Sequence, residues 1–522
     1  MHIVLVSTYV YPIALGMRYV SAVLKRAGHR VTLLFLNSPP GRPEVEVSPA
    51  LRDDFVDHCR GADVFGFSLM TNSFHRASHL TAILREAGLQ APVVWGGTHA
   101  TVAPHESAEV ADYVCVGEGE NPMLEFVDAL AAGHDPTGTR SFAYLRHGRF
   151  VQNPAFPLTC DLDSLPFPDY DLEGHWVVHR GRLVEARPER LGGVLERYRT
   201  SSTRGCPYSC SFCNNSTQMR VYRGPGLGKW VRKRSTESVI TELESIRARH
   251  PQVEAVNLID DLFLIRSEEE IEEFVEAYRT RVNLPIEIDA FPNTVTDEKI
   301  ERLARLPISL ISMGIQSGSP DTLRNLYNRP TRPETVANAI EIIARHGLPA
   351  EYHYLVANPF ESDESRIETL RFAAEHHRGP ARIRIFPLQF YPGSVLYDRA
   401  RAEGVIDERP KEAYRFVYTG KRHILALRYL EVWLMIVLGL RNAGLSARTA
   451  HRAVNFALNP FVRWCLDRRR FASVAFVMYR VGRSLYRNLI VKPILQPIAW
   501  LRRRRRSDSP EESRRAARRR AA

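Results

Sequence analysis

The stretch RGCPYSCSFCNN, Arg204 to Asn215, places Cys206, Cys210 and Cys213 inside eight residues, and these are three of the chain's seven cysteines. An odd total with three crowded thiols indicates metal binding rather than disulfides. A structural zinc site needs a fourth ligand at a short spacing, yet the next histidine along the chain is His250. Three thiolates instead suit a four-iron cluster that leaves one iron free. A zinc knuckle or a chance grouping of cysteines is the alternative interpretation.

The cysteines directly follow the first of six consecutive strand–helix units. Strands are expected at 198–203, 255–260, 285–291, 308–315, 350–357 and 382–390. Helices with acidic starts and basic ends lie between them, for example at 236–249 and 267–278. This alternation predicts a partial (β/α)6 barrel, whose chemistry would sit at the carboxyl ends of its strands.

Apolar runs joined by helices also fill the N-terminal part of the chain. Strands are expected at 2–6, 30–36, 63–69, 92–97 and 113–120, with helices at 17–27 and 77–87. Such runs predict a doubly wound parallel sheet covered on both faces. Ligands bind at the carboxyl ends of the strands in such sheets. The predicted ligand loops are therefore 7–16, 68–74, 96–101 and 117–121.

The sequence as a whole predicts an α/β protein whose C-terminal part differs from the two α/β domains before it. We expect a Rossmann-like domain at 1–145, a Pro- and Arg-rich linker at 146–195, the barrel at 196–405, a mainly helical region at 406–500 and a basic tail at 501–522. Residues 421–522 hold 24 Lys+Arg against 5 Asp+Glu, leaving 47 basic and 54 acidic residues, a balance of −7, in the first 420. The overall charge of +12 therefore belongs to the C-terminal part.

Two segments of the C-terminal part are candidates for membrane contact. The apolar run 424–440 is 17 residues long and includes Arg428 and Glu431, so a buried or interfacial helix is expected rather than a membrane span. The segment 474–501 places Arg480, Arg483 and Arg487 on one helical face, a pattern typical of helices on anionic membrane surfaces. A solvated charged face is the alternative. The N-terminus lacks the features of a signal peptide, so a cytoplasmic protein is expected, peripheral to the inner face of the membrane if this helix binds there.

With an aromatic residue just before its last cysteine, CPYSCSFC (206–213) resembles the hallmark of the radical S-adenosylmethionine (SAM) superfamily. The resemblance implies that the open iron of a 4Fe-4S cluster binds SAM, and that an electron from the cluster cleaves SAM to methionine and a 5'-deoxyadenosyl radical. LIDDLFL (258–264), GIQSGS (314–319), ANPFE (357–361) and FYPGS (390–394) resemble further family segments and occur in the family's order. The resemblance implies that the residues that contact SAM include Asp260, Asp261, Gly314, Gln316 and Ser317. Gln316 stands where the family commonly has Glu, so a charge is lost and a hydrogen-bonding group is kept.

The N-terminal sheet, with GGTHAT (96–101) and CVGEGE (115–120), resembles the cobalamin-binding domain that precedes the radical SAM core in one large subfamily. The resemblance covers roughly residues 1–405. It implies cobalamin contacts from Ser68, Thr71, Gly96, Gly97, Thr98, His99, Gly117, Glu118 and Gly119. The D-x-H-x-x-G motif of other cobalamin enzymes is missing, so we expect no histidine ligand to cobalt, and a lone His99 does not change this. A nucleotide-binding domain or a structural remnant is the alternative, although no G-x-G-x-x-G follows the first strand.

The resemblance implies a methyltransferase that acts on an unactivated carbon of a lipid or other secondary metabolite. Methylcobalamin would supply the methyl group and a second SAM would remethylate the cobalt; flavodoxin or ferredoxin would supply the electron. A cyclase or rearrangement enzyme resembling the anaerobic magnesium-protoporphyrin monomethyl ester cyclase is the second hypothesis. An RNA-modifying enzyme that uses the arginine tail is the third, disfavoured because most of the chain is acidic, and a nonenzymatic iron-sulfur protein is the fourth. The sequence assigns no catalytic residue beyond the cluster.

Overall fold

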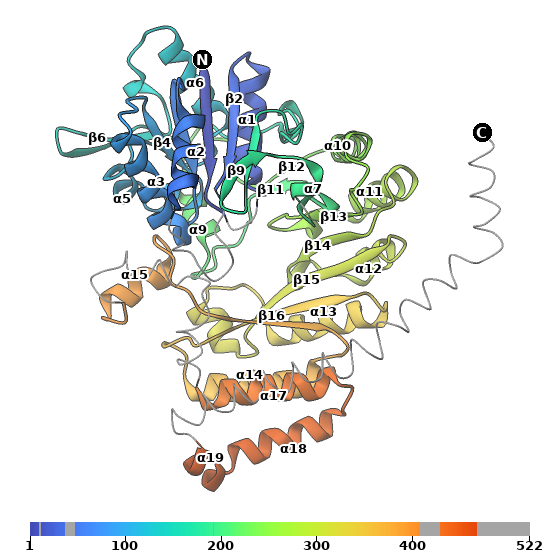
Figure 1. Cartoon of the computed structure of the whole chain (residues 1–522). Coiled ribbons are helices and arrows are strands. Elements are labelled where there is room, and N and C mark those ends of the chain that lie inside the picture. The colour runs from blue at the N-terminus through green and yellow to red at the C-terminus, as the bar shows by residue number, and fades with distance from the viewer. Residues whose placement is uncertain (10–11, 37–46, 192, 407–427, 467–522) are drawn as a thin grey trace, which may run out of the picture.

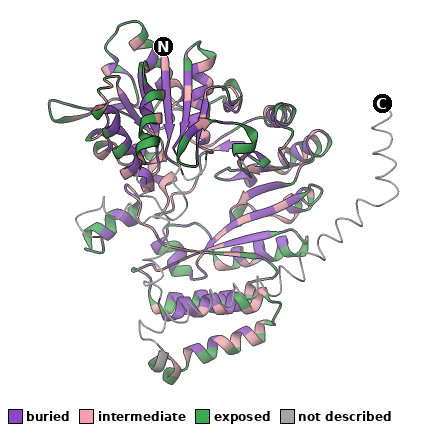
Figure 2. Cartoon of the chain, viewed as in Figure 1, coloured by how far each residue is buried: buried purple, intermediate pink, exposed green. Residues whose placement is uncertain are grey.

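The computed structural model describes residues 1–9, 12–36, 47–191, 193–406 and 428–466. Figure 1 shows two α/β domains that follow one another along the chain, with a layer of C-terminal helices beyond the second domain. Each domain is built on its own sheet, and the strands of both sheets are largely buried (Figure 2). The predicted α/β class with two successive sheets is therefore confirmed.

The first domain is a nine-stranded sheet in the order β7-β6-β5-β4-β3-β1-β2-β8-β9. Its central strands run parallel, and the order reverses between β1 and β3, as in a doubly wound sheet. The strands are β1 His2–Ser7, β2 Arg30–Phe35, β3 Val64–Ser68, β4 Val93–Gly96, β5 Tyr113–Cys115, β6 Phe142–Arg146, β7 Arg149–Gln152, β8 His175–His179 and β9 Arg182–Glu185. Its helices are α1 Leu15–Arg26, α2 Pro49–Cys59, α3 Phe74–Glu86, α4 Thr98–Val102, α5 Pro104–Ala108 and α6 Glu120–Ala131.

The segment 146–195, predicted as a linker, contributes three of these strands. β7 pairs antiparallel with β6 at one edge of the sheet, whereas β8 pairs with β2 at the other edge and turns back as β9. These strands are four or five residues long, too short to produce a sustained hydrophobic period in the sequence. The segment thus joins the two domains and also completes the first sheet.

The second domain is a six-stranded parallel sheet in the order β10-β13-β14-β15-β16-β17, as the six predicted units require. Its strands are β10 Arg197–Thr200, β13 Ala255–Leu258, β14 Ile286–Ala290, β15 Ile308–Gln316, β16 Ala350–Val356 and β17 Arg382–Pro387. A separate antiparallel ribbon pairs β11 Thr203–Arg204 with β12 Arg232–Lys233. The helices around this domain are α7 Pro188–Leu191, α8 Gly193–Glu196, α9 Asn214–Val221, α10 Thr236–Arg249, α11 Glu268–Arg281, α12 Asp297–Leu303, α13 Pro333–Arg345, α14 Asp363–His376 and α15 Val395–Ala402.

The two faces of the second sheet differ in chemistry. Alternate residues such as Ile286 and Ile288 belong to a large buried apolar cluster that includes residues of α10, α11 and α13. The residues between them are polar, and the register sets them in rows: Glu287 lies beside Asn257, and Asp289 lies beside Ser312. The polar face therefore lies opposite the apolar face that the helices cover. Side chains on the polar face can contact a ligand.

The C-terminal helices α17 Tyr429–Asn442, α18 Ala447–Leu458 and α19 Pro460–Leu466 form the outermost layer in Figure 1. α17 packs against α14 and is largely buried, as expected for the apolar run at 424–440, of which 424–427 lie outside the described residues. Glu431 is one reason for this placement, because its carboxylate accepts a hydrogen bond from the Ala357 backbone N–H at 2.6 Å. In the described part of the chain, no helix is long and apolar enough to cross a membrane. The predicted amphipathic segment 474–501 and the tail 501–522 fall outside it.

Candidate active site

The three cysteines lie on a loop between β11 and α9, and neighbouring elements hold this loop on several sides. The Ser211 backbone N–H donates to the Tyr327 carbonyl at 2.9 Å, and the Trp230 indole N–H donates to the Cys206 carbonyl at 3.0 Å. Tyr208 stacks on Phe291, which follows β14, with ring centroids 4.0 Å apart. The loop is therefore fixed at the carboxyl end of the second sheet, as predicted.

The spacing of the thiols bears on the metal they can bind. Among the described residues, the only three His, Cys, Asp or Glu residues whose ligand atoms lie within 4.8 Å of one another are Asp169, Asp171 and His175. At least one pair of the cysteine sulfurs is therefore more than 4.8 Å apart, which is wider than two ligands of a single zinc ion, whose bonds to sulfur are about 2.3 Å. Thiolates of a four-iron cluster bind different irons and so stand farther apart. The donor set and its spacing fit a 4Fe-4S cluster.

Burial keeps these thiols protonated in the absence of a metal. Desolvation raises the pKa of Cys206 to about 11 and that of Cys213 to about 12, and it also raises the pKa of Cys210. Nearby anions act in the same direction on Cys206 and Cys213, whereas Arg329 opposes the rise at Cys210. Cluster binding must therefore displace protons, as thiolate ligation generally does.

Asp260 and Asp261 both support the cysteine loop. The Asp260 carboxylate is buried and accepts hydrogen bonds from the backbone N–H groups of Ser202 and Thr203, at 2.5 and 2.8 Å. Asp261 accepts from the Gly205 backbone at 3.2 Å and from the Asn215 amide at 2.6 Å. These contacts hold the backbone that enters and leaves the loop, so a positioning role is what the structure supports for them. Their contact with SAM stays a prediction.

The residues of the segment GIQSGS (314–319), at the end of β15, lie in two different environments. Gln316 has a positive φ of 69°, uncommon for a residue other than glycine, and its amide lies against Gly314. A Cβ at Gly314 would stand 2.3 Å from the Gln316 Nε2 atom, so this close approach requires glycine. Ser317 is buried, and its hydroxyl lies 2.8 Å from that of Thr369 on α14. Gly314 and Gln316 therefore stay candidates for ligand contact, whereas Ser317 packs the strand against a helix.

Arg329 was not singled out in the sequence, yet the structure places it beside the cysteines. Its side chain is buried, its guanidinium lies 4.1 Å from the centre of the Phe291 ring, and one N–H donates to the Gly314 carbonyl at 2.6 Å. Burial lowers the pKa of Arg329, and a hydrogen bond with Cys210 acts in the opposite direction. None of the ion pairs found among the described residues includes Arg329, so this buried cation is available to an anion that binds at the thiols.

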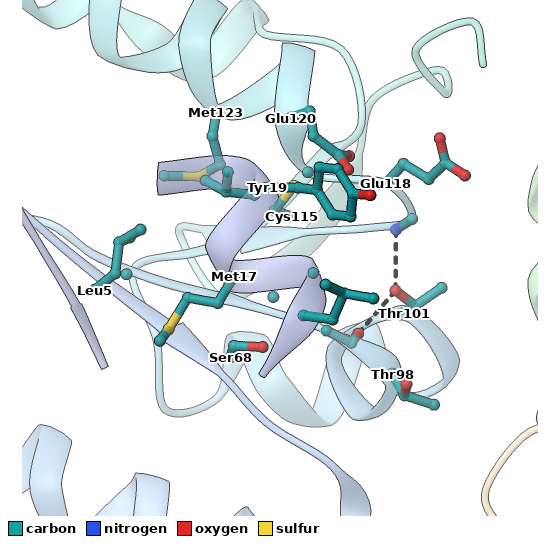
Figure 3. Close-up of a pocket in the computed structure, with 18 of the residues that line it drawn as sticks. Leu5, Met17, Tyr19, Ser68, Thr98, Thr101, Cys115, Glu118, Glu120 and Met123 are labelled. Atoms are coloured by element: carbon teal, nitrogen blue, oxygen red, sulfur yellow. Dashed lines mark hydrogen bonds between the residues drawn. The ribbon is translucent and has the colours of Figure 1, made fainter. Parts of the chain in front are cut away.

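A cavity of about 310 Å³ lies at the carboxyl ends of the first domain's strands. Figure 3 shows residues of several strands and of the helices that follow them around this space, including Ser68, Thr98 and Glu118. The Thr101 hydroxyl accepts from the Gly117 N–H at 3.0 Å and donates to the Gly97 carbonyl at 2.9 Å, which ties two of the loops together. Of the nine residues predicted to contact cobalamin, seven line the cavity: Ser68, Gly96, Gly97, Thr98, Gly117, Glu118 and Gly119.

Thr71 and His99 do not line this cavity. Both are buried, and the His99 ring nitrogen lies 3.3 Å from the Thr71 hydroxyl, beneath the cavity wall. His99 also packs against Phe74 of α3, with ring centroids 5.1 Å apart. That His99 is no cobalt ligand stays a prediction. Its position in a Gly-bearing loop had placed it among the candidates, but its side chain faces the core.

The cavity also contains residues that sequence reasoning did not single out. Tyr9, Leu15, Gly16 and Thr101 lie in predicted ligand loops, but the residues from the second domain could not be expected, because they meet the cavity only in the folded chain. The lining residues not among the predicted contacts are Leu5, Tyr9, Leu15, Gly16, Met17, Tyr19, Val20, Gly66, Phe67, Val94, Thr101, Cys115, Glu120, Met123, Ser201, Arg204 and Gln218.

Ion pairs connect this cavity to the cysteine loop. Arg204 lies two residues before Cys206 and pairs with Glu118 at 3.3 Å and with Glu120 at 2.8 Å. Arg232, its neighbour in the β11–β12 ribbon, also pairs with Glu118. The two arginines hold the pKa of Glu118 below its usual range, although burial opposes them. The two domains are therefore joined by a largely buried, charge-balanced network beside both sites.

Gly117 is required where the domains meet. Its φ is +96°, and a Cβ there would lie 2.0 Å from the hydroxyl oxygen of Tyr222, which follows α9. We expect Gly117→Ala to displace Tyr222 and to weaken cobalamin binding at least about tenfold, since strain of 1–3 kcal/mol adds to the clash. Cobalamin retained after gel filtration, measured by visible absorbance, checks this. Gly133→Ala is the matched control because Gly133 has a φ of +73° and open space around it; equal losses in both variants would contradict the role of the clash.

Comparison with known proteins agrees with this arrangement. The B12 binding domain family matches residues 1–127, over the cavity, and the radical SAM superfamily matches residues 200–373, over the cysteine loop and most of the second sheet. The chain therefore carries a B12-binding domain followed by a radical SAM domain.

Particular relatives match a large part of the chain. An uncharacterized methyltransferase of Pyrococcus horikoshii is 25% identical over 347 residues, which cover 66% of this chain and 70% of the relative. The anaerobic magnesium-protoporphyrin IX monomethyl ester cyclase of Rubrivivax gelatinosus is 26% identical over 60% of this chain, and this match spans only 54% of the cyclase. The radical SAM methyltransferase TsrM of Kitasatospora setae shares the fold, with a TM-score of 0.61 at 16% identity, over 77% of each chain.

Proposed function

We propose that this protein is a cobalamin-dependent radical SAM methyltransferase that acts on an unactivated carbon of a small molecule. The observation that carries the proposal is the adjacency of the two sites. Ser201, Arg204 and Gln218 line the cavity, and the last two lie within five residues of the cysteines on either side. A methyl donor in the cavity and a radical generated at the cysteine loop would then reach the same substrate.

The two cofactors would supply the difficult steps: radical generation from SAM at the cluster, and methyl donation from cobalamin. This chain's residues bind and orient. Cys206, Cys210 and Cys213 would hold the cluster, while Asp260 and Asp261 keep their loop in place through the backbone. Gly117 and Gly97 allow Tyr222 and the Leu69 backbone to pack closely against the loops that would hold the corrinoid. Arg329 offers a planar pair of donors to the carboxylate of SAM.

The polar face of the second sheet supports a substrate that carries hydrogen-bonding groups. Glu351 accepts from Arg384 at 2.8 Å and lies 3.0 Å from a ring nitrogen of His353. Asp289, nearer the cysteine loop along its strand, has its pKa raised to about 7 by burial and by Asp260. These groups pair in part with one another, and polar groups of a substrate would meet the hydrogen-bonding capacity that remains, whereas a wholly apolar substrate would not. A lipid would therefore have to present a polar headgroup here.

The proposal also includes an electron donor, a membrane contact and a location in the cell. A small iron-sulfur or flavin protein would deliver the electron, the basic segment at 474–501 would hold the enzyme at an anionic membrane surface, and the protein would work in the cytoplasm. Cyclisation is the second candidate because the cyclase of Rubrivivax gelatinosus matches 60% of this chain. RNA modification has less support, since none of the relatives compared above is named for it.

Product analysis separates methyl transfer from cyclisation. We expect the reconstituted protein, given a substrate and a reductant, to form S-adenosylhomocysteine and 5'-deoxyadenosine in about equal amounts, because one SAM gives the radical and another the methyl group. Liquid chromatography with mass spectrometry measures both, and SAM labelled in its methyl group shows the label in product. 5'-Deoxyadenosine without S-adenosylhomocysteine would contradict methyl transfer and favour the cyclase hypothesis.

A further inference from the structure

The outermost helices α18 and α19 expose three large aromatic side chains. Phe461 is 72% exposed, Trp464 is 70% exposed and Phe456 is 55% exposed, more than any other large apolar residue among the described residues. Phe461 and Trp464 stack on each other with centroids 6.4 Å apart, and Phe456 packs beside Trp433 of α17. Phe456, Phe461 and Trp464 are here called the aromatic ridge. Contiguous exposed apolar groups of this kind mark interaction surfaces.

The helices α18 and α19 carry basic but no acidic side chains, and two of the basic ones, His451 and Arg463, pair with Glu375 and Asp363 of α14. α18 buries Ala450, Val454 and Ala457 against the protein, so that Arg448 and Arg452 face outward. Residues 447–466 contain no Asp or Glu, and neither of these arginines has an ion pair among the described residues. Such a surface is complementary to an apolar layer beneath an anionic one. Phe and Trp beside Arg are the residues that the interfacial region of a membrane favours.

The sequence that follows the ridge has the same character. Residues 467–522 begin directly after α19 and hold 17 Lys+Arg against 4 Asp+Glu. Juxtaposed basic residues are attracted to anionic headgroups, each contributing about 1 kcal/mol near the surface. α18 and α19 lie on the side of the second domain away from the B12-binding domain (Figure 1), so the ridge can meet a surface without covering the cavity.

We propose that the aromatic ridge inserts into the interfacial layer of an anionic lipid bilayer, with Arg448 and Arg452 on its headgroups. An RNA backbone is less complementary, because it offers anionic groups to the arginines but no continuous apolar layer to the ridge. The inserted side chains provide an apolar contribution that salt does not screen. Electrostatic attraction of 467–522 would add to it. This inference does not depend on the proposed methyl transfer.

Vesicle binding by the full-length protein tests the ridge. We expect Phe461→Ser combined with Trp464→Ser to weaken partitioning to vesicles of phosphatidylglycerol and phosphatidylcholine at least about tenfold, since two large aromatic groups no longer leave water. The loss should persist at high salt, where binding through the tail alone disappears. Leu145→Ser, on an exposed strand of the first domain, is the matched control and should bind like the wild type.

A second measurement reports on insertion itself. Brominated phosphatidylcholine in the same vesicles should quench tryptophan fluorescence of the wild type, and Trp464→Phe should lose that quenching while it still binds. Partitioning of the double variant equal to that of the wild type would overturn the proposal. So would displacement of the wild type from vesicles by RNA, with an RNA affinity that the double variant loses. Neither assay requires substrate or turnover, so the vesicle results can be interpreted even if the protein transfers no methyl group.

Discussion

Cys206→Ala is expected to abolish reductive cleavage of SAM and to leave the reconstituted protein without a stable four-iron cluster. Three thiolates are the fewest that hold such a cluster with one iron open, so losing one leaves two irons without protein ligands. The side chain of Cys206 is partly exposed and its main chain is held by Trp230, so the fold should survive. Iron content, the visible spectrum and 5'-deoxyadenosine formation measure the effect.

Cys160→Ala is the matched control, because Cys160 is an exposed cysteine outside the loop. This variant should keep its iron and cleave SAM at the wild-type rate. If Cys206→Ala retained cluster and cleavage while its circular dichroism matched the wild type, Cys206 would not be a cluster ligand. The assignment of the whole loop would then be wrong.

Arg329→Met is expected to weaken SAM binding at least about thirtyfold and to reduce cleavage by a similar factor. The substitution keeps much of the side chain's bulk but removes a buried cation that pairs with no acidic residue in the described part of the chain. Removing one partner of a buried charge pair costs about 2–5 kcal/mol, which corresponds to this loss or a larger one. Equilibrium dialysis of SAM against the anaerobic, cluster-containing protein measures the affinity.

Two variants sharpen this result. Arg329→Lys keeps the charge but loses the planar pair of donors, so it should recover only part of the affinity. Arg324→Met changes an exposed arginine close by in the chain and should have no effect. Wild-type affinity for SAM in Arg329→Met, with its iron content intact, would show that the guanidinium supports the loop and does not bind SAM.

Local patterns in the sequence predicted the architecture well. All eleven strands that were expected in the two sheets are present, with ends that differ by a few residues at most positions. Buried parallel strands are continuous apolar runs, and turn-forming residues separate them from helices, so each unit can be recognised from its own residues. The cysteine spacing is equally local, which is why the metal site could be predicted without the structure.

Features that depend on distant contacts could not be predicted. Arg329 lies 116 residues after Cys213 in the sequence. It meets the cysteine loop only in the folded chain, where Phe291, which follows β14, and Gly314 of β15 hold its side chain. Gly117 looks like one more loop glycine until Tyr222 is found against it. His99 shows the same limit, since its loop position indicates a ligand contact, whereas the fold buries its side chain. Orientation of a side chain is set by packing, which a single sequence does not contain.

Metal analysis of the anaerobically purified and reconstituted protein tests the central claim most directly. The cysteine loop beside the cavity of the B12-binding domain predicts about four iron atoms, about four sulfide ions and about one cobalt atom per chain, the cobalt in cobalamin. Inductively coupled plasma mass spectrometry and the visible spectrum give these values together. A colourless protein that holds neither iron nor cobalt after reconstitution, yet is folded by circular dichroism, would contradict the account.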